Sequence, residues 1–380
     1  MKLSNQRHLY DIPDDVSYLN CGYMSPLMDM VREAGVLGLS AKRHPWTITP
    51  PDFFTGSNRM REAFAALVHA SPEDIAIVPA ASYGMSAAAK NLPLSKGQTV
   101  IVAEDQFPSH LFPWRERARD VGAEVCTVGR PDNDDWTEAV LETLDRRTAI
   151  LAVPHCHWTD GGLFDLERLS SECRERNIAL ALDVTQSAGA LPLDVRTVQP
   201  DFLTAATYKW LMGPYLLGVL YVSKRWQEEG TPLEQNWIHR KGSENFSRLV
   251  DYEDAFAPGA VRFDVGERSN FALVPAAEAG IRQLLEWGVE NIAETLGAVT
   301  ASIAERASEL GLSSIANDKR AGHYLGLKMP GGLPPNLPAE LAKRNVYVSV
   351  RGPSIRVTPH LYNNEGDVDR FFTALKEVLG

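Results

Sequence analysis

The sequence of 380 residues has few cysteines and no long hydrophobic run. Its four cysteines form no CxxC pair, which argues against a disulfide scaffold and fits a reducing compartment. The N-terminus MKLSNQRHLYDIPDD lacks the apolar core of a signal peptide, and no later run approaches the roughly 18 apolar residues of a membrane helix. We therefore expect neither secretion nor membrane insertion, and a cytoplasmic location.

Basic residues are also fewer than acidic ones, which argues against a protein that binds nucleic acid or a membrane surface. Asp and Glu outnumber Lys and Arg by 49 to 38, so no basic surface for nucleic acid or an anionic membrane is indicated. The pattern G-x-G-x-x-G is absent after the first predicted strand, which disfavours a nucleotide-binding oxidoreductase. With 44% hydrophobic and 23% charged residues, the composition is that of an ordinary globular protein, and a metabolic enzyme is the compatible class.

Seven short apolar runs between residues 75 and 222 predict the strands of one sheet. Most are continuous and separated by helical stretches, which is typical of a mainly parallel, doubly wound α/β sheet. Only nine residues separate the last two runs, too few for a parallel crossover, so we expect the seventh strand to run antiparallel to the sixth. The predicted strands are Ile75–Pro79, Thr99–Ala103, Ala123–Val128, Ala149–Pro154, Ile178–Asp183, Phe202–Thr207 and Leu217–Val222, and the predicted helices are Tyr83–Asn91, Leu111–Val121, Trp136–Leu144 and Leu166–Arg176.

The rest of the chain predicts a second, smaller domain. Residues 224–262 carry many charges and aromatics with little periodicity and suggest a long surface connection. Helical spacing returns from Val274 to about Leu310, and strand-like segments, a short helix and a closing helix follow. We expect an N-terminal segment (1–20), a large α/β domain (21–265) and a small α+β domain (266–380).

A lysine and a carboxylate carry the main chemical signal. Lys209 ends the sixth strand in TYKW. Taken alone, it fits a surface lysine, with its stem buried and its ammonium in solvent, at least as well as a buried catalytic lysine. Asp183 ends a buried strand 26 residues earlier, where a carboxylate either caps a helix or meets a cation. Together with Gln186, the pattern D-x-x-Q followed by Y-K-W fits a Schiff-base lysine and a carboxylate paired with the protonated pyridine nitrogen of pyridoxal phosphate.

Three other residues follow strand ends. Ser82, in AASYG, opens a helix whose free N–H groups bind an anion, or it simply caps that helix. Phe107 offers a ring to a flat heteroaromatic ligand, or anchors its loop. His155 belongs to this set too, and since ligands bind at the carboxyl edge of an open α/β sheet, all these strand-end residues are expected to converge.

The segment HCHWTDG invites a metal site and a substrate cavity as alternatives. His155 and His157 flank Cys156, but no partner with zinc-like spacing exists elsewhere, so we expect no metal. Trp158 and Thr159 are expected to line a substrate cavity.

These segments resemble the class V aminotransferase family of fold-type I pyridoxal-phosphate enzymes, in particular its kynureninase, isopenicillin N epimerase and cysteine desulfurase-like branch. The resemblance extends over residues 18–363, through YLNCGYMSPL, PAASYGMS, QFPSHLFPW, PHCHWTDG, LDVTQSAGALPLDV, TYKWLMGPYLLGVLYV, VRFDVGERSNF and SIRVTPHLYN. It implies the transferase-like fold of that family, pyridoxal 5'-phosphate as cofactor, an amino-acid substrate and a homodimer with the active site at the interface.

The resemblance also implies residue roles around the cofactor. Lys209 would form the internal aldimine, Asp183 would keep the pyridine nitrogen protonated, and Gln186 would contact the phenolate oxygen. Phe107 would stack on the ring. The phosphate would be held by Ala81, Ser82, Tyr83, Thr207 and Tyr208.

On the substrate side, the resemblance implies that Arg356 grips the α-carboxylate as a bidentate fork, with Asn20 near the same carboxylate. By the same analogy, Trp237 or the loop Gly266–Asn270 would reach the site of the neighbouring subunit. Trp158 is the third expected substrate contact.

Two departures from the family pattern narrow the reaction. Residues 174–380 contain no cysteine, so the mobile nucleophilic cysteine of desulfurases has no counterpart, and Trp158 stands where desulfurases carry an asparagine. We favour an aminotransferase acting at the α-carbon of an amino acid, with a β-eliminating lyase (a C–S lyase or kynureninase-like enzyme) second. Epimerisation and a catalytically silent binding protein stay open, because a shared scaffold does not specify the reaction.

Overall fold

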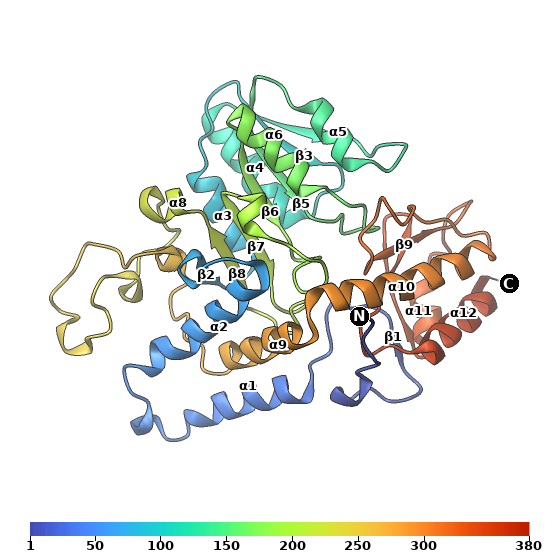
Figure 1. Ribbon diagram of the computed structural model, residues 1–380, viewed down its shortest axis with the longest axis horizontal. Helices are drawn as coiled ribbons and strands as arrows, with labels where there is room; N and C mark the ends of the chain where they lie inside the picture. The colour runs from blue at the N-terminus through green and yellow to red at the C-terminus, as the bar shows by residue number, and fades with distance from the viewer. Residues whose placement is uncertain (380) are drawn as a thin grey trace.

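The computed structural model describes residues 1–379, and a seven-stranded sheet lies at the centre of its larger half (Figure 1). Only β8 runs antiparallel to its neighbours, β2 and β7, and the other pairs in the sheet are parallel. This confirms the mainly parallel sheet and the reversed seventh strand. In sheet order the strands are β2 (Ile75–Val78), β8 (Gly218–Val222), β7 (Phe202–Ala206), β6 (Ala179–Asp183), β5 (Thr148–Pro154), β3 (Thr99–Ala103) and β4 (Glu124–Val128).

Burial explains why the strands read as continuous apolar runs. Every residue of β2, β3, β5 and β7 is buried, because helices cover both faces of the sheet. The edge strand β4 is partly exposed along most of its length. The helices that follow these strands are α3 (Ala81–Asn91), α4 (Pro108–Val121), α5 (Trp136–Thr143), α6 (Leu166–Arg176), α7 (Val195–Val198) and α8 (Lys224–Glu229).

Two of these helices begin earlier than predicted, and both starts matter for the site. Helix α3 begins at Ala81 rather than Tyr83, directly after the extended Ala80. Helix α4 begins at Pro108 rather than Leu111, since proline at the first helical position loses no hydrogen bond. Both helix N-termini therefore lie directly after β2 and β3, at the carboxyl edge of the sheet.

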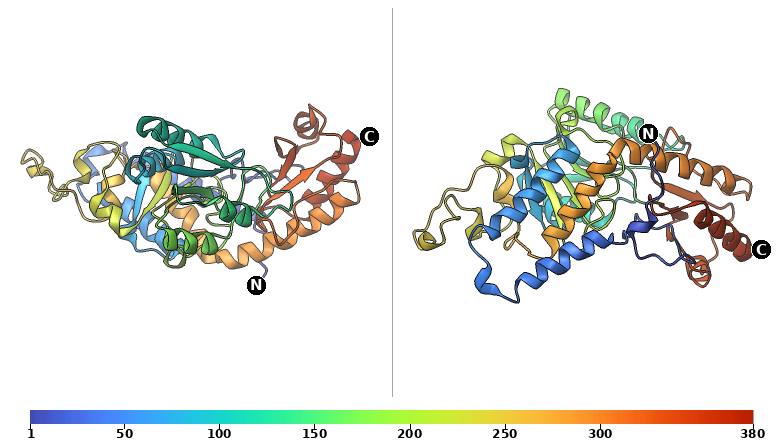
Figure 2. Two further views of the ribbon diagram at one scale, coloured as in Figure 1. Left: turned by 90° about the horizontal axis from the view of Figure 1, so that it is seen from above. Right: turned by 60° about the horizontal axis from the view of Figure 1, so that its bottom comes forward.

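A layer of three long helices covers one face of the larger half. Helix α9 (Leu273–Trp287) packs against α1 (Asp29–Ala41) and α2 (Asp52–Val68), and the right view of Figure 2 shows α2 and α9 in front of the sheet with α1 along its lower edge. No helix or strand is predicted for residues 29–68, so α1 and α2 are new findings. The predicted domain boundary at residues 265 and 266 stays a prediction, but α9 beyond it packs on the larger half.

The C-terminal half contains a small antiparallel sheet with strand order β11, β12, β9. The N-terminal segment joins this half, because β1 (Ser17–Tyr18) pairs in parallel with β10 (Val346–Tyr347). The remaining elements here are α10 (Val289–Ser308), β9 (Leu325–Lys328), α11 (Leu337–Ala342), β11 (Ser349–Arg351), β12 (Ser354–Val357) and α12 (Glu365–Leu379).

Short 3₁₀ turns make up the rest of the regular structure. The connection over residues 224–262 holds, besides α8, only the turns Trp237–His239, Phe246–Arg248 and Ala260–Phe263. The others are Arg7–Leu9, Pro45–Thr47 and Pro72–Asp74. No helix in residues 1–379 combines the length and apolar character needed to span a membrane.

Candidate active site

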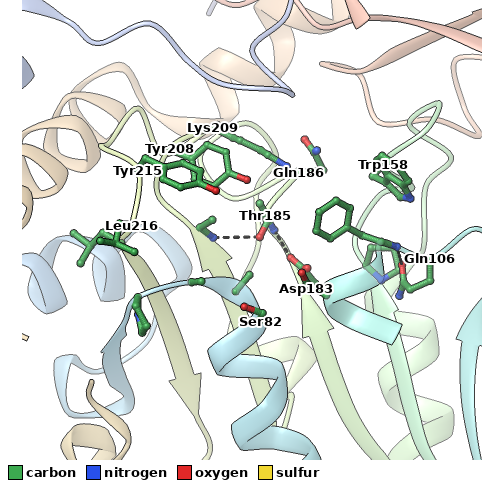
Figure 3. Close-up of a pocket in the computed structure, with 18 of the residues that line it drawn as sticks. Ser82, Gln106, Trp158, Asp183, Thr185, Gln186, Tyr208, Lys209, Tyr215 and Leu216 are labelled. Carbon is green, nitrogen blue, oxygen red and sulfur yellow. Dashed lines mark hydrogen bonds between the residues drawn. The ribbon is translucent and has the colours of Figure 1, made fainter. Parts of the chain in front are cut away.

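A cavity of about 240 Å³ lies at the carboxyl edge of the large sheet (Figure 3). The ends of β2, β3, β5, β6 and β7 all contribute to its lining, as expected for ligand sites in open α/β sheets. Of the residues singled out from the sequence, those that line it are Ala81, Ser82, Phe107, Trp158, Asp183, Gln186, Tyr208 and Lys209.

Lys209 follows β7 and is 7% exposed. Burial lowers the pKa of its amine to about 8; the charges of Arg356 and Arg351 act in the same direction, and Asp183 opposes them. Its Nζ atom lies 5.5 Å from the ring centroids of both Phe107 and Tyr208. The amine is largely withdrawn from water, and this burial favours its neutral form.

Asp183 is the last residue of β6, on the strand next to β7. Its carboxylate accepts a hydrogen bond of 2.9 Å from the backbone N–H of Thr185, whose hydroxyl oxygen accepts one of 3.1 Å from the N–H of Ala206 (Figure 3). Within residues 1–379 the carboxylate has no cation within 4 Å. An anion that is only 9% exposed is costly without a cation or further donors, so Asp183 is suited to a positively charged ligand atom.

Hydrogen bonds hold the side-chain amide of Gln186 at both its oxygen and its nitrogen. Its amide oxygen accepts a hydrogen bond of 2.9 Å from the indole of Trp210, and its Nε2 donates one of 3.0 Å to the carbonyl of Gly22. One N–H of the amide remains for a ligand, and Gln186 lines the cavity.

The N-terminus of α3 forms the anion-binding end of the cavity. The N–H groups of Tyr83 and Gly84 donate to the carbonyl of Ala80, which leaves the amides of Ala81 and Ser82, two residues that line the cavity. Free amides and the positive end of an eleven-residue helix together favour a phosphate group.

Four of the expected cofactor and substrate contacts lie outside the cavity lining, and so does Thr159, which lines an adjoining hollow instead. Thr207 donates its hydroxyl to the carbonyls of Pro214 (2.7 Å) and Leu217 (3.0 Å), so it holds the following turn rather than facing the cavity. The hydroxyl of Tyr83 is buried without a partner, and burial, assisted by Glu234 and Asp264, raises its pKa.

Arg356 and Asn20, the other two, are linked through one serine. Arg356 Nε donates to Ser349 Oγ at 2.9 Å and Nη1 donates to the carbonyl of Trp158 at 3.1 Å. Ser349 in turn donates to the amide oxygen of Asn20 at 2.9 Å. Because Trp158 lines the cavity and accepts a hydrogen bond from Arg356, Arg356, Ser349 and Asn20 form a hydrogen-bonded group next to the cavity.

His155 does not converge with the other strand-end residues. It lines a separate hollow beside the start of α6, and its Nδ1 has no partner. His157 is fully buried, stacks on Trp136 and bonds to Thr159 and the carbonyl of Glu104. Both histidines therefore lie away from the cavity lining.

The family model for "Aminotransferase class-V" matches residues 52–371. The chain belongs to the class V aminotransferase family. Relatives include "Uncharacterized aminotransferase YcbU" of Bacillus subtilis, 28% identical over 81% of this chain and 80% of that protein. Isopenicillin N epimerase of Amycolatopsis lactamdurans is 25% identical over 99% and 98% of the two chains, and kynureninase of Bacillus anthracis 23% identical over 93% and 83%.

Solved structures show the same fold. A cysteine desulfurase of Thermococcus onnurineus superposes with a TM-score of 0.86 at 20% identity, covering 100% of this chain and 99% of the other. C-DES, in a variant with glycine covalently linked to its PLP cofactor, superposes with a TM-score of 0.87 at 18% identity over 98% and 99% of the chains. These matches confirm the fold-type I architecture expected from the sequence.

Membership of the class V family makes pyridoxal 5'-phosphate (PLP) the cofactor of this chain, and the cavity fits it. The uncompensated Asp183 suits a protonated pyridine nitrogen, and the amides of Ala81 and Ser82 suit a phosphate. Lys209 is the lysine within the cavity lining.

Three polar residues of this class V site are not found by the sequence analysis: Thr185, Gln106 and Ser349. Thr185 sits between Asp183 and Gln186 in the D-x-x-Q motif, so motif position was an available signal. Gln106 lines the cavity and bonds to His110 (2.9 Å), a fully buried imidazole whose pKa burial lowers to about 4. Ser349 has no local signal, because only strand pairing places it beside Arg356.

Proposed function

We propose that this class V enzyme is an aminotransferase that acts at the α-carbon of an amino acid through Lys209. The observation that carries the proposal is that Asp183 and Lys209, from the ends of adjacent strands, line one cavity with the N-terminus of α3. PLP, when bound, supplies an electron sink for the electron pair left at the α-carbon. The remaining work falls to the side chains of this chain.

Lys209 is suited to move a proton at the α-carbon. A pKa of about 8 leaves roughly a tenth of the amine neutral at pH 7, about 200 times more than in an ordinary lysine with a pKa of about 10.4. The neutral amine accepts the proton, and its protonated form returns one. The aromatic rings of Phe107 and Tyr208 limit access of water to Nζ.

The other side chains of the site hold the cofactor and orient the substrate. The Asp183 carboxylate would hold a proton on the pyridine nitrogen, and the free N–H of Gln186 would donate to the phenolate oxygen. Phe107 would contact the pyridine ring. Arg356, which is 2% exposed and oriented by Ser349, binds the α-carboxylate.

A β-eliminating lyase is the second candidate, because kynureninase is among the relatives that align over most of this chain. Adding single amino acids to the holoenzyme separates the reactions. An aminotransferase releases keto acid equal in amount to the enzyme and then stops until an acceptor keto acid is added. Continuous product release without acceptor, as ammonia from a β-elimination or as alanine from a kynureninase-like cleavage, would establish the lyase, and inversion without keto acid the epimerase; any of these results would refute transamination.

We also propose a homodimer with the active site at its interface. Tyr215 and Leu216 line the cavity and are 62% and 61% exposed, so two adjacent large side chains at the cavity rim are open to a partner. A second hollow on the surface joins Leu39 of α1 with Trp237 and the segment around Ser269, the segments expected to reach a neighbouring site. Sedimentation should show a dimer, and Leu216→Glu should weaken both association and PLP retention; a PLP-loaded wild-type monomer would refute the proposal.

A further inference from the structure

Two arginines leave the same face of the β11–β12 hairpin. Ser349 pairs with Arg356 and Arg351 pairs with Ser354 in the antiparallel register, and paired residues share a face. Residues two apart on one strand also share a face, so Arg351 and Arg356 project together. Their guanidinium carbons both lie 5.9 Å from the indole of Trp158, which lines the active-site cavity.

Two contacts hold the indole ring of Trp158 in place. The indole N–H of Trp158 donates to the carbonyl of Asp105 at 2.6 Å. Phe107 meets the same ring edge-on, with centroids 5.3 Å apart at 80°. The two guanidinium groups thus flank a fixed wall of the cavity.

Neither arginine is neutralised. Arg356 donates to a serine hydroxyl and to a backbone carbonyl, and Arg351 donates only to the carbonyl of Val350, at 2.8 Å. Across residues 1–379, no carboxylate lies within 4 Å of either group. Two like charges beside the same ring, one buried and one partly buried, are stabilised when an anion joins them.

The cations next to them are, by contrast, neutralised. Arg130 and Lys328 line the adjoining hollow on the other side of Trp158, and both face Asp160, at 2.6 Å and 3.9 Å. The positive charge left without a partner at this end of the cavity therefore belongs to Arg351 and Arg356.

One arginine suffices for the α-carboxylate of an amino acid, so the second is available to a second anion. Building on the proposed function, we infer that the substrates of this enzyme are α-amino acids with an anionic side chain, and that Arg351 binds the side-chain anion while Arg356 binds the α-carboxylate. Arg351 is the less buried of the two and has a single backbone contact, so its guanidinium is free to adjust to side chains of different length.

The test compares amino acids that differ in side-chain charge but little in shape. With the PLP-loaded enzyme, apparent dissociation constants are taken from the change in cofactor absorbance for aspartate against asparagine and glutamate against glutamine. A charged hydrogen-bond pair is worth about 10- to 150-fold, so we expect the acidic member of at least one pair to bind about 10-fold or more tightly. Arg351→Gln should bring that ratio close to 1 by weakening the acidic ligand alone.

Two matched variants isolate the contribution of Arg351. Arg351→Lys keeps the charge and should retain part of the preference. Arg344→Gln removes an arginine of the same domain whose partners are Glu340 and Glu377, and should leave the preference unchanged. Equal weakening of alanine and glutamate by Arg351→Gln would overturn the inference, as would a wild-type enzyme that prefers the amides.

A second measurement separates this inference from the proposed function. Succinate and glutarate lack an amino group, so calorimetric binding of these diacids, compared with butyrate, reports on the arginine pair and not on chemistry. Tighter diacid binding that is lost in Arg351→Gln, without any spectral response to amino acids, would refute the proposed reaction and leave the anion pair standing. A spectral response to amino acids with equal binding of diacid and monoacid would refute the anion pair alone.

Discussion

The indole N–H of Trp210 donates to the amide oxygen of Gln186 at 2.9 Å, joining the two halves of the D-x-x-Q and Y-K-W pattern. Trp210 is fully buried, directly after Lys209. The bond fixes which end of the Gln186 amide carries its N–H groups, one of which donates to the carbonyl of Gly22. The residue that follows the lysine thus orients a side chain of the cofactor cavity.

Trp210→Phe should change how the protein holds its cofactor, in addition to lowering the free energy of unfolding. The amide oxygen of Gln186 loses its donor, a loss of about 1–3 kcal/mol in the free energy of unfolding, and its amide is free to turn. We expect an altered cofactor absorbance and weaker PLP retention. The control is Trp226→Phe, which removes a similar indole bond, to Asp201 at 2.7 Å, far from the cavity; equal cofactor effects in both variants would contradict the role of Trp210.

The capture of PLP by the apoprotein should follow the neutral form of Lys209. Because burial lowers the pKa of this amine to about 8, the rate should rise through pH 8 and level off above it, well below the profile of free lysine. Asp183 raises this pKa, so Asp183→Asn should move the profile to lower pH, and Arg356→Gln should move it to higher pH. Stopped-flow absorbance checks the shifts; identical profiles in all three proteins would contradict the assignment.

Gly84→Ala should displace the N-terminus of α3 from the sheet. A Cβ atom there would lie 2.5 Å from Thr204 Oγ1 and 2.9 Å from its Cβ, both in the buried strand β7. Overpacking of this kind costs about 1–3 kcal/mol of unfolding free energy, and inorganic phosphate should bind the apoprotein more weakly.

A matched glycine lies in α2, where a Cβ on Gly56 meets only Val274 Cγ1, at an ordinary 3.7 Å. Gly56→Ala should therefore stabilise by about 0.5–1 kcal/mol, because alanine is the better helix former. Urea unfolding measures both changes. A Gly84→Ala protein as stable as Gly56→Ala would mean that α3 adjusts without cost.

Arg356→Gln should raise KM for amino acids by about 10- to 100-fold while the enzyme keeps its cofactor. The reason is that a bidentate charged contact to the α-carboxylate is lost, whereas Arg356 is absent from the cavity lining. Arg306→Gln, which breaks an exposed pair with Asp369, serves as the control and should leave KM unchanged. Loss of PLP in Arg356→Gln would contradict this separation of roles.

Local pattern predicted the sheet well because each strand carries its own signal. The run Thr99–Ala103 and the helix Leu166–Arg176 have the predicted bounds, and the reversal of β8 follows from a loop too short for a crossover. Helices α1 and α2 were missed, although α2 buries one face against α9, more than 200 residues later in the chain.

Within the site, motif positions placed the residues that follow strands. Ser82, Phe107, Asp183 and Lys209 share the cavity, whereas His155 points into another hollow and the Thr207 hydroxyl turns to the carbonyls of its own loop. A strand-end position is readable in a sequence. The direction in which its side chain leaves depends on φ, ψ and neighbours that the sequence alone does not show.

Which residues lie at the carboxyl edge of the sheet can be predicted from the order of amino acids, because parallel strands with apolar runs all end at that edge. Which residues they contact there depends on how the rest of the chain packs against the sheet. Trp158 is joined by Arg356 and Arg351, nearly 200 residues later, and Ser349 links Asn20 to Arg356 across almost the whole chain. Contacts between residues so far apart arise from domain packing and strand register. A local sequence pattern shows that a residue is buried, but not which distant residue it contacts.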